Sequence, residues 1–270
     1  MALTDRHQAA QAQLADRLVA LIRLRYRAAV GREEDFQAFV QRMLSLVRVQ
    51  RSASATLARV YYRQFSLLET GEPTTFGAPP DFPEDAVRES LYATGRGKLA
   101  EHLRAGADRA EAVDLAGRDV AGSMMRHTLN GARDVLADAF TRDRRAVGWV
   151  RVTREGCCYF CAVLASRGHI YREQSFDASD PRFRDGVVPS DHKVHDNCRC
   201  FLEPVYSRTA ALPGRADEYE KLWYEVTSSF SGWEKALAFR RTFESLARGE
   251  DRETALARGL RQDVVVDSAA

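Results

Sequence analysis

Gly156-Cys-Cys-Tyr-Phe-Cys161 and, 33 residues later, His195-Asp-Asn-Cys-Arg-Cys200 hold all five cysteines of this 270-residue chain. Each stretch adjoins a segment typical of a β-strand: 147–153 leads into the first, and 199–206 begins within the second. The polar stretch 175–193 between them contains two prolines and is typical of a long loop. We therefore predict a small β unit with its cysteines at the ends of the strands.

The spacing of these residues is that of a metal site. Cys158-x-x-Cys161 offers two thiolates to one tetrahedral ion, and His195-x-x-Cys198 offers a second pair. Because residues two apart on a strand face the same side, Cys200 can point to the same place as Cys198. We predict a Zn²⁺ site with the candidate ligands Cys158, Cys161, His195, Cys198 and Cys200. The preferred set is the first three, with either Cys198 or Cys200 as the fourth ligand.

Other interpretations of the cysteines stay open at this point. They could be buried reduced thiols, a strand-tying disulfide or a redox-active Cys-x-x-Cys. If zinc binds, Cys157 is the spare thiol, and four protein ligands would close the coordination sphere and make the ion a structural staple. A nucleophilic Cys158–His195 pair is the catalytic alternative. Ser190-Asp191-His192 is a weaker one, since adjacency in sequence is not triad geometry.

The rest of the chain is predicted to be mostly helical. Apolar residues recur every three or four positions in 1–72, as on the buried faces of long helices broken near Gly31. The predicted core positions there are Leu14, Leu18, Leu21, Phe36, Val40, Met43, Val47, Leu57, Tyr61, Phe65 and Leu68. A helix over 109–142 carries a face of small residues, including Gly117 and Gly131, that permits close packing. Two helices follow Pro213, the second opened by a Ser231-Gly-Trp-Glu234 capping box.

These patterns give an α+β fold, mostly α-helical, with long N-terminal helices, a small zinc-stapled β subdomain and C-terminal helices. The predicted divisions are an N-terminal helical region 1–72, a linker 73–83, a domain 84–206 of helices followed by the Cys/His β subdomain, and a helical tail 207–270.

Charge and composition name no partner by themselves. Forty basic against 38 acidic residues leave +2, and no apolar run approaches a membrane span or a signal peptide, so we expect neither a membrane nor a secreted protein. Residues 1–70 hold eleven arginines against six acidic residues, a net +5. We interpret this as a solvated helix face, with a surface for nucleic acid or an acidic partner as the alternative.

The cysteine segments also carry a family resemblance. Cys158-Tyr-Phe-Cys161-Ala-Val-Leu-Ala-Ser-Arg-Gly168, Tyr171, His195-x-x-Cys-Arg-Cys200 and Glu203-Pro-Val-Tyr206 together resemble the phage Mu protein F-like (MuF-like) minor head proteins. The likeness is closest to members from phages and prophages of actinobacteria. It covers about 84–206 and is strongest over 147–206. The family motif falls on the five candidate ligands, and Cys157 is extra to it.

The resemblance implies a minor capsid protein acting in head morphogenesis. Such a protein would be assembled in the bacterial host cytoplasm and would lie inside the virion head. Its expected partners are the portal protein and the major capsid or scaffold protein, with packaged DNA as a further candidate and no membrane. Two alternatives are a capsid maturation protease and a MuF-type adaptor domain of a toxin or secretion system. We lean toward a protein that is not an enzyme.

Overall fold

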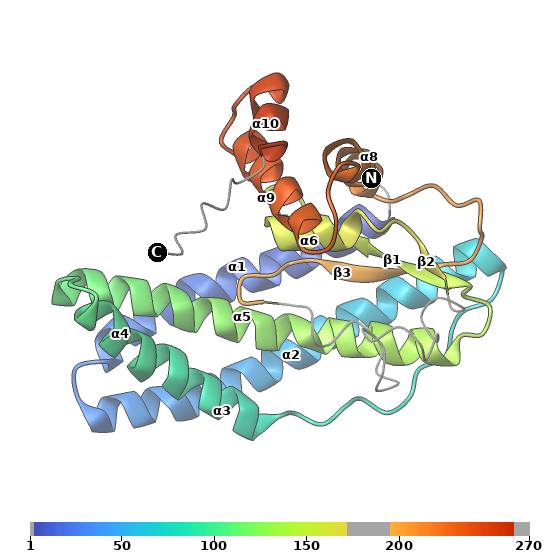
Figure 1. The fold of residues 1–270 in the computed structure, drawn as a ribbon. Helices are drawn as coiled ribbons and strands as arrows, with labels where there is room; N and C mark the ends of the chain where they lie inside the picture. Colours follow the sequence, from blue (N-terminus) through green and yellow to red (C-terminus); the bar gives the residue numbers. More distant parts are fainter. Residues whose placement is uncertain (1–2, 172–194, 262–270) are drawn as a thin grey trace.

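The computed structural model describes residues 3–171 and 195–261, and it is mostly helical with one small sheet, as the sequence predicts (Figure 1). The elements in chain order are α1 (Leu3–Ala29), α2 (Glu33–Thr70), α3 (Glu84–Tyr92), a π-helical turn η1 (Ala93–Gly97), α4 (Lys98–Arg104), α5 (Arg109–Arg142), β1 (Gly148–Val152), α6 (Tyr159–Ala165), β2 (Ile170–Tyr171), β3 (Phe201–Val205), α8 (Ala216–Thr227), α9 (Glu234–Ala247) and α10 (Arg252–Gly259).

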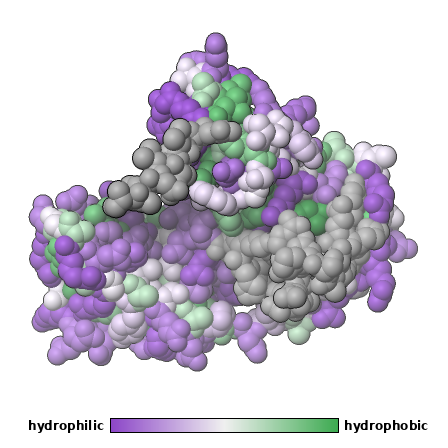
Figure 2. All heavy atoms as spheres, viewed as in Figure 1, coloured by the Kyte–Doolittle hydropathy of each residue, from purple (hydrophilic) through white to green (hydrophobic). Residues whose placement is uncertain are grey.

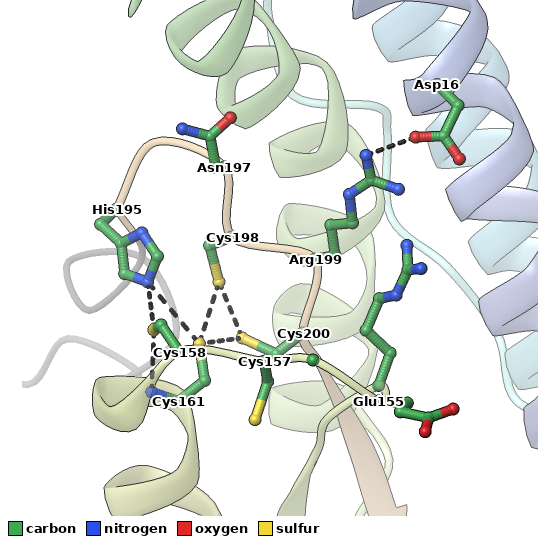
Figure 3. A pocket seen from close by; sticks show the side chains of 12 residues that line it. Asp16, Glu155, Cys157, Cys158, Cys161, His195, Asn197, Cys198, Arg199 and Cys200 are labelled. Carbon is green, nitrogen blue, oxygen red and sulfur yellow. Dashed lines mark hydrogen bonds and ion pairs between the residues drawn. The ribbon is translucent and has the colours of Figure 1, made fainter. Parts of the chain in front are cut away.

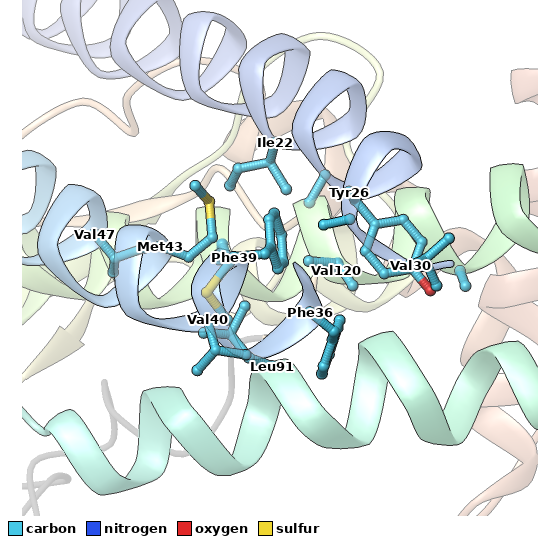
Figure 4. Packing of buried hydrophobic residues seen from close by; sticks show 14 of the residues in the cluster. Ile22, Tyr26, Val30, Phe36, Phe39, Val40, Met43, Val47, Leu91 and Val120 are labelled. Atoms are coloured by element: carbon cyan, nitrogen blue, oxygen red, sulfur yellow. The ribbon is translucent and has the colours of Figure 1, made fainter. Parts of the chain in front are cut away.

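Three long helices, α1, α2 and α5, form the body of the molecule, with α3 and α4 along it (Figure 1). Figure 4 shows the centre of this body, where Tyr26 of α1 and Phe36 and Phe39 of α2 pack together. The Tyr26 hydroxyl donates to the Gly95 carbonyl in η1 at 2.6 Å. The Phe36 ring lies so close to Gly95 that a Cβ there would sit 2.8 Å from it. The helix is thus widened where an aromatic ring presses on it.

The small-residue face of α5 lets α2 approach closely. An ideal Cβ on Gly131 would lie 2.2 Å from the backbone oxygen of Arg51. Arg51 is buried beside α5, where its Nη1 donates to the His127 carbonyl at 2.7 Å and its Nη2 pairs with Asp134. The predicted helix over 109–142 and the reason for its small face are both confirmed.

The sheet is antiparallel with strand order β2-β1-β3. Trp149 lies opposite Pro204, and every residue of β1 and β3 is buried. Val152 packs into a cluster with α2 and α5, whereas Val150 packs with residues of α6, α8 and α9. The sheet therefore lies between the helical body and the C-terminal helices, which Figure 1 shows above it. The two predicted strands are confirmed, and β2 is a two-residue addition.

Some local predictions are wrong. Leu21 and Leu68 are 37% and 75% exposed, because the buried faces of α1 and α2 pass through Ile22 and Ser66 instead. The capping box before α9 does not form: Gly232 has φ +50°, and the turn it makes leaves Trp233 at the N-cap.

Residues on both sides of 73–83 share one core, since α1 and α2 pack on α5. The stretch 73–83 itself is neither helix nor strand. The predicted domain boundaries stay predictions. The expected loop 175–193, with Ser190, Asp191 and His192, lies outside the described residues. Within the part of the chain that the structure describes, every helix is too short or too polar to cross a bilayer. Figure 2 shows hydrophilic side chains over most of the visible face of the helical body.

Candidate metal centre

The first half of the centre is a turn that leads from β1 into α6. Gly156 has φ +70°, a left-handed conformation that glycine adopts without strain. Cys158 is the N-cap residue of α6, and its sulfur accepts a hydrogen bond from the Cys161 backbone N–H at 3.4 Å. The sequence predicts the Cys-x-x-Cys spacing, but not the short helix that follows it. Because α6 begins directly after Cys158, the sulfurs of Cys158 and Cys161 lie on the same side of the turn.

The second half docks on α5 before it enters β3. The Asn197 N–H donates to the Gly122 carbonyl at 3.4 Å, and Asn197 takes a left-handed φ of 66°. Gly122 gives the loop room, because a Cβ there would lie 2.6 Å from the Asn197 side chain. Asp196 pairs with Arg126 of α5 at 2.6 Å. These contacts hold the loop that carries His195 and Cys198 in place.

All five predicted ligands converge (Figure 3). They form two groups that share Cys161: one with Cys158 and His195, the other with Cys198 and Cys200. The His195 Nε2 lies 2.8 Å from the Cys158 sulfur and 3.8 Å from the Cys161 sulfur. The Cys161 sulfur lies 3.4 Å from that of Cys198 and 3.6 Å from that of Cys200.

Cys157 does not belong to either group. In Figure 3 its sulfur points away from the other four, and it lies 3.4 Å from the Tyr219 hydroxyl of α8. The Cys157 sulfur thus lies outside both groups, and its assignment as the spare thiol stays a prediction. All five cysteines are free, with no disulfide among them.

Two buried arginines support the centre. Arg133 of α5 donates from Nη2 to the Cys198 carbonyl at 2.7 Å and from Nε to the Cys200 carbonyl at 3.1 Å. Arg151 of β1 donates from Nη1 to the Cys200 sulfur at 2.7 Å. Neither arginine is predicted from the sequence, because an arginine in a helix or strand is ordinarily expected at the surface.

The electrostatics of the cluster favour an anionic sulfur at Cys158 and Cys200, whereas the pKa values of Cys161 and Cys198 are raised. Hydrogen bonding from Cys161, with His195 contributing, lowers the pKa of Cys158 to about 5. The pKa of Cys200 is lowered well below its usual value by hydrogen bonds from Cys161 and Cys198 and by the charges of Arg151 and Arg133. Cys161 shares its hydrogen bonds with these neighbours, and its own pKa is raised. Thiolates are the form of cysteine that binds metals.

The orientation of His195 turns its Nε2 atom toward the sulfurs of the cluster. His195 Nδ1 lies 2.5 Å from the Asp196 backbone oxygen, so the neutral imidazole that would bind a metal keeps its proton on Nδ1 and turns the lone pair of Nε2 toward the sulfurs.

The residues present fit a thiophilic ion. Three thiolates and one imidazole around a divalent cation leave a net charge of −1, which a buried guanidinium such as that of Arg151 can balance. Arg151 is 3% exposed and directly contacts the cluster.

A pocket of about 480 Å³ opens beside the centre. Its lining includes Cys158, His195 and the charged residues Arg154, Asp16 and Arg199. Arg199 forms an ion pair with Asp16 of α1, which links the cysteine loop to the helical body (Figure 3).

Among the comparisons with known proteins, only the one with family models gives a match. No curated protein and no solved structure matches the chain. A family model described as VG15 protein matches residues 1–226, which include the helical body, the sheet and the whole cysteine centre. The chain therefore belongs to the VG15 protein family, a family of viral gene proteins.

Proposed function

We propose that this protein is a minor head protein of a phage, acting in head morphogenesis, with a Zn²⁺ ion that holds its β subdomain together. The observation that carries the proposal is the convergence of Cys158, Cys161 and His195 with Cys198 and Cys200 on the surface of α5. Membership of a viral family over 1–226 supports the phage context. The resemblance of 84–206 to MuF-like minor head proteins supplies the specific role.

Zinc suits this donor set better than a hard cation. Thiolate and imidazole ligands select zinc and related ions, whereas magnesium and calcium take oxygen ligands. The two half-sites flank residues 162–194, and closing so long a loop costs chain entropy that one shared ion can offset. The ion would thereby fix β3 against β1 and both against α5.

The expected place of the protein is the interior of the head, bound to the portal and to the major capsid or scaffold protein. Contact with packaged DNA is a further candidate. The long helices α1, α2 and α5 supply the extended surface that such contacts need. If this role is right, heads assembled without the protein will be defective, and the protein will sediment with procapsids formed by the portal and capsid proteins.

The metal is tested by elemental analysis of purified full-length protein. We expect one zinc per chain, its loss in Cys161→Ser, and its retention in the matched control Cys157→Ser, because the Cys157 sulfur lies outside both groups. Removal of zinc by a chelator should lower the midpoint of thermal unfolding. Absence of stoichiometric zinc, or unchanged stability after chelation, would contradict the staple.

A capsid maturation protease is the second candidate, and one distance favours it. The Cys158 sulfur lies 2.8 Å from His195 Nε2, beside the pocket described above, which is the arrangement of a cysteine nucleophile and its base. Co-expression with the capsid protein distinguishes the two roles. Trimming of the capsid protein that Cys158→Ala abolishes, in a protein purified free of zinc, would establish the protease and refute the structural role.

A further inference from the structure

A groove lies between α1 and α2 at the surface of the helical body, with the core residues Phe39 and Met43 at its base. It has a volume of about 490 Å³. Leu21 and Arg25 of α1 line it on one side, and Phe39, Arg42, Met43 and Leu46 of α2 line the other. The two helices are antiparallel neighbours, since Gln11 bonds to Ser54 and Thr4 reaches Tyr61.

The groove continues into an apolar stripe along the outer face of α2. Val49, Val60 and Leu67 follow Leu46 at helical spacing, and they are 63%, 51% and 48% exposed. From Ala38 to Leu67 this face extends about 44 Å at 1.5 Å per residue. Ala53 and the polar residues Thr56, Arg63 and Gln64 occupy the turns between them. Three exposed large hydrophobic side chains on one outward face are nonetheless more than a solvated helix face ordinarily carries.

Two of the three charged residues that line the groove are arginines. Arg25 and Arg42 form no salt bridge within residues 3–171 and 195–261. Asp35 also lines the groove, but its carboxylate is taken by Arg32, at 2.8 Å from Nε. An apolar floor flanked by two arginines that form no salt bridge in the described residues suits a partner that is both hydrophobic and anionic.

We propose that this groove binds an acidic amphipathic helix of a partner protein. Leucine-like side chains of that helix would lie between Leu21 and Leu46, in the way a third helix packs on an antiparallel pair. Glutamates or aspartates on its flanks would pair with Arg25 and Arg42. Nucleic acid matches the arginines but leaves the apolar stripe uncovered. A second copy of the chain would bring like charges together.

The proposal is tested with the full-length protein and two labelled helical peptides. Both peptides carry the same leucine face, one with glutamates and the other with lysines on the flanks, and binding is followed by fluorescence anisotropy. We expect the glutamate peptide to bind at least tenfold more tightly, and its affinity to fall as salt is raised. The double variant Arg25→Glu, Arg42→Glu should remove that preference, and Val49→Glu should weaken binding.

Arg104→Glu is the matched control, because Arg104 is an exposed arginine on α4, outside the groove. It should leave binding unchanged, and far-ultraviolet circular dichroism should show that every variant is folded. Equal affinity for both peptides, or an unaffected double variant, overturns the proposal. Two further results would also overturn the proposal. One is that a 20-base-pair DNA binds more tightly than the glutamate peptide and that the double variant abolishes this binding. The other is that the protein self-associates and that Val49→Glu abolishes the self-association. These results would assign the face to nucleic acid or to a second copy.

Discussion

Because α2 and α5 approach each other closely at Gly131, we predict that a methyl group added there lowers the free energy of unfolding substantially. Gly131 faces α2 with the Arg51 backbone oxygen 2.2 Å from the place where a Cβ would be. The obstacle is backbone, so it cannot rotate away as a side chain would. Gly131→Ala must therefore move the two helices apart locally by about 1 Å, against a close-packed interior.

The magnitude follows from two opposing effects. Alanine is favoured over glycine within a helix by about 1 kcal/mol. Overpacking a core costs about 1–3 kcal/mol, and we take the upper end because the obstacle is backbone. The net expectation is a loss of about 2 kcal/mol in the free energy of unfolding. For a protein of this size that lowers the thermal midpoint by about 4–8 °C.

Gly97 provides the comparison. It is exposed, has right-handed helical angles, and the nearest atom to its ideal Cβ is 3.9 Å away. Gly97→Ala should therefore stabilise the protein by about 0.5–1 kcal/mol. Both variants can be measured by urea unfolding with circular dichroism. If Gly131→Ala proves as stable as the unmodified protein, α2 and α5 do not approach each other as closely as the 2.2 Å distance implies.

Three other predictions concern buried polar groups. Arg133→Met leaves the Cys198 and Cys200 carbonyls without their hydrogen-bond donor. The variant should bind zinc about 10–100-fold more weakly in a competition assay with a chromophoric chelator. An unchanged affinity would show that Arg133 does not support the centre. Burial lowers the pKa of His7 to about 4, so the unfolded chain binds more protons between pH 4 and 6.5 and stability should fall as the pH drops through that range. His7→Phe should reduce this fall in urea unfolding at pH 7 and pH 4.5, and identical slopes would refute the assignment. Burial raises the pKa of Glu203 despite the hydrogen bonds that its carboxylate accepts from Thr4 and Tyr61. Stability should therefore decrease as the pH rises above about 4.5 and through the raised pKa. Glu203→Gln should flatten that decrease, and identical pH profiles for the variant and the unmodified protein would refute the role of Glu203.

Periodicity predicted the elements whose pattern is long and regular. The break near Gly31, the helix over 109–142 and the two main strands all follow from residue spacing and β-branched content. The prediction of Leu21 and Leu68 as core residues is wrong because a helical repeat of leucines marks a hydrophobic face, but does not say whether that face meets the core or the surface. Spacing alone therefore could not separate the core from the outer stripe of α2.

For the metal centre, local spacing predicted which residues meet, but not what surrounds them. Cys-x-x-Cys and His-x-x-Cys are each recognisable from a few neighbouring residues as a pair of metal ligands. Since one tetrahedral ion takes two such pairs, the convergence of Cys158 with His195 was predictable. Arg133 and Arg151 contact the centre from α5 and β1, and only the tertiary fold brings them there. The two-residue strand β2 is equally a product of its neighbour, because two residues carry no pattern of their own.

The position of the sheet has a consequence for how the molecule comes apart. The largest hydrophobic cluster draws its residues from α1 to α5 and the turns that join them, while a separate cluster joins β1 and β3 to α6, α8 and α9. Cooperative opening of a protein tends to follow such packing units. The cysteine centre lies at the seam between them, on α5 and at the start of α6 and β3. A metal there would add to the free energy of local opening of the C-terminal unit, which the contacts of Val152 and Phe201 with α2 and α5 also oppose.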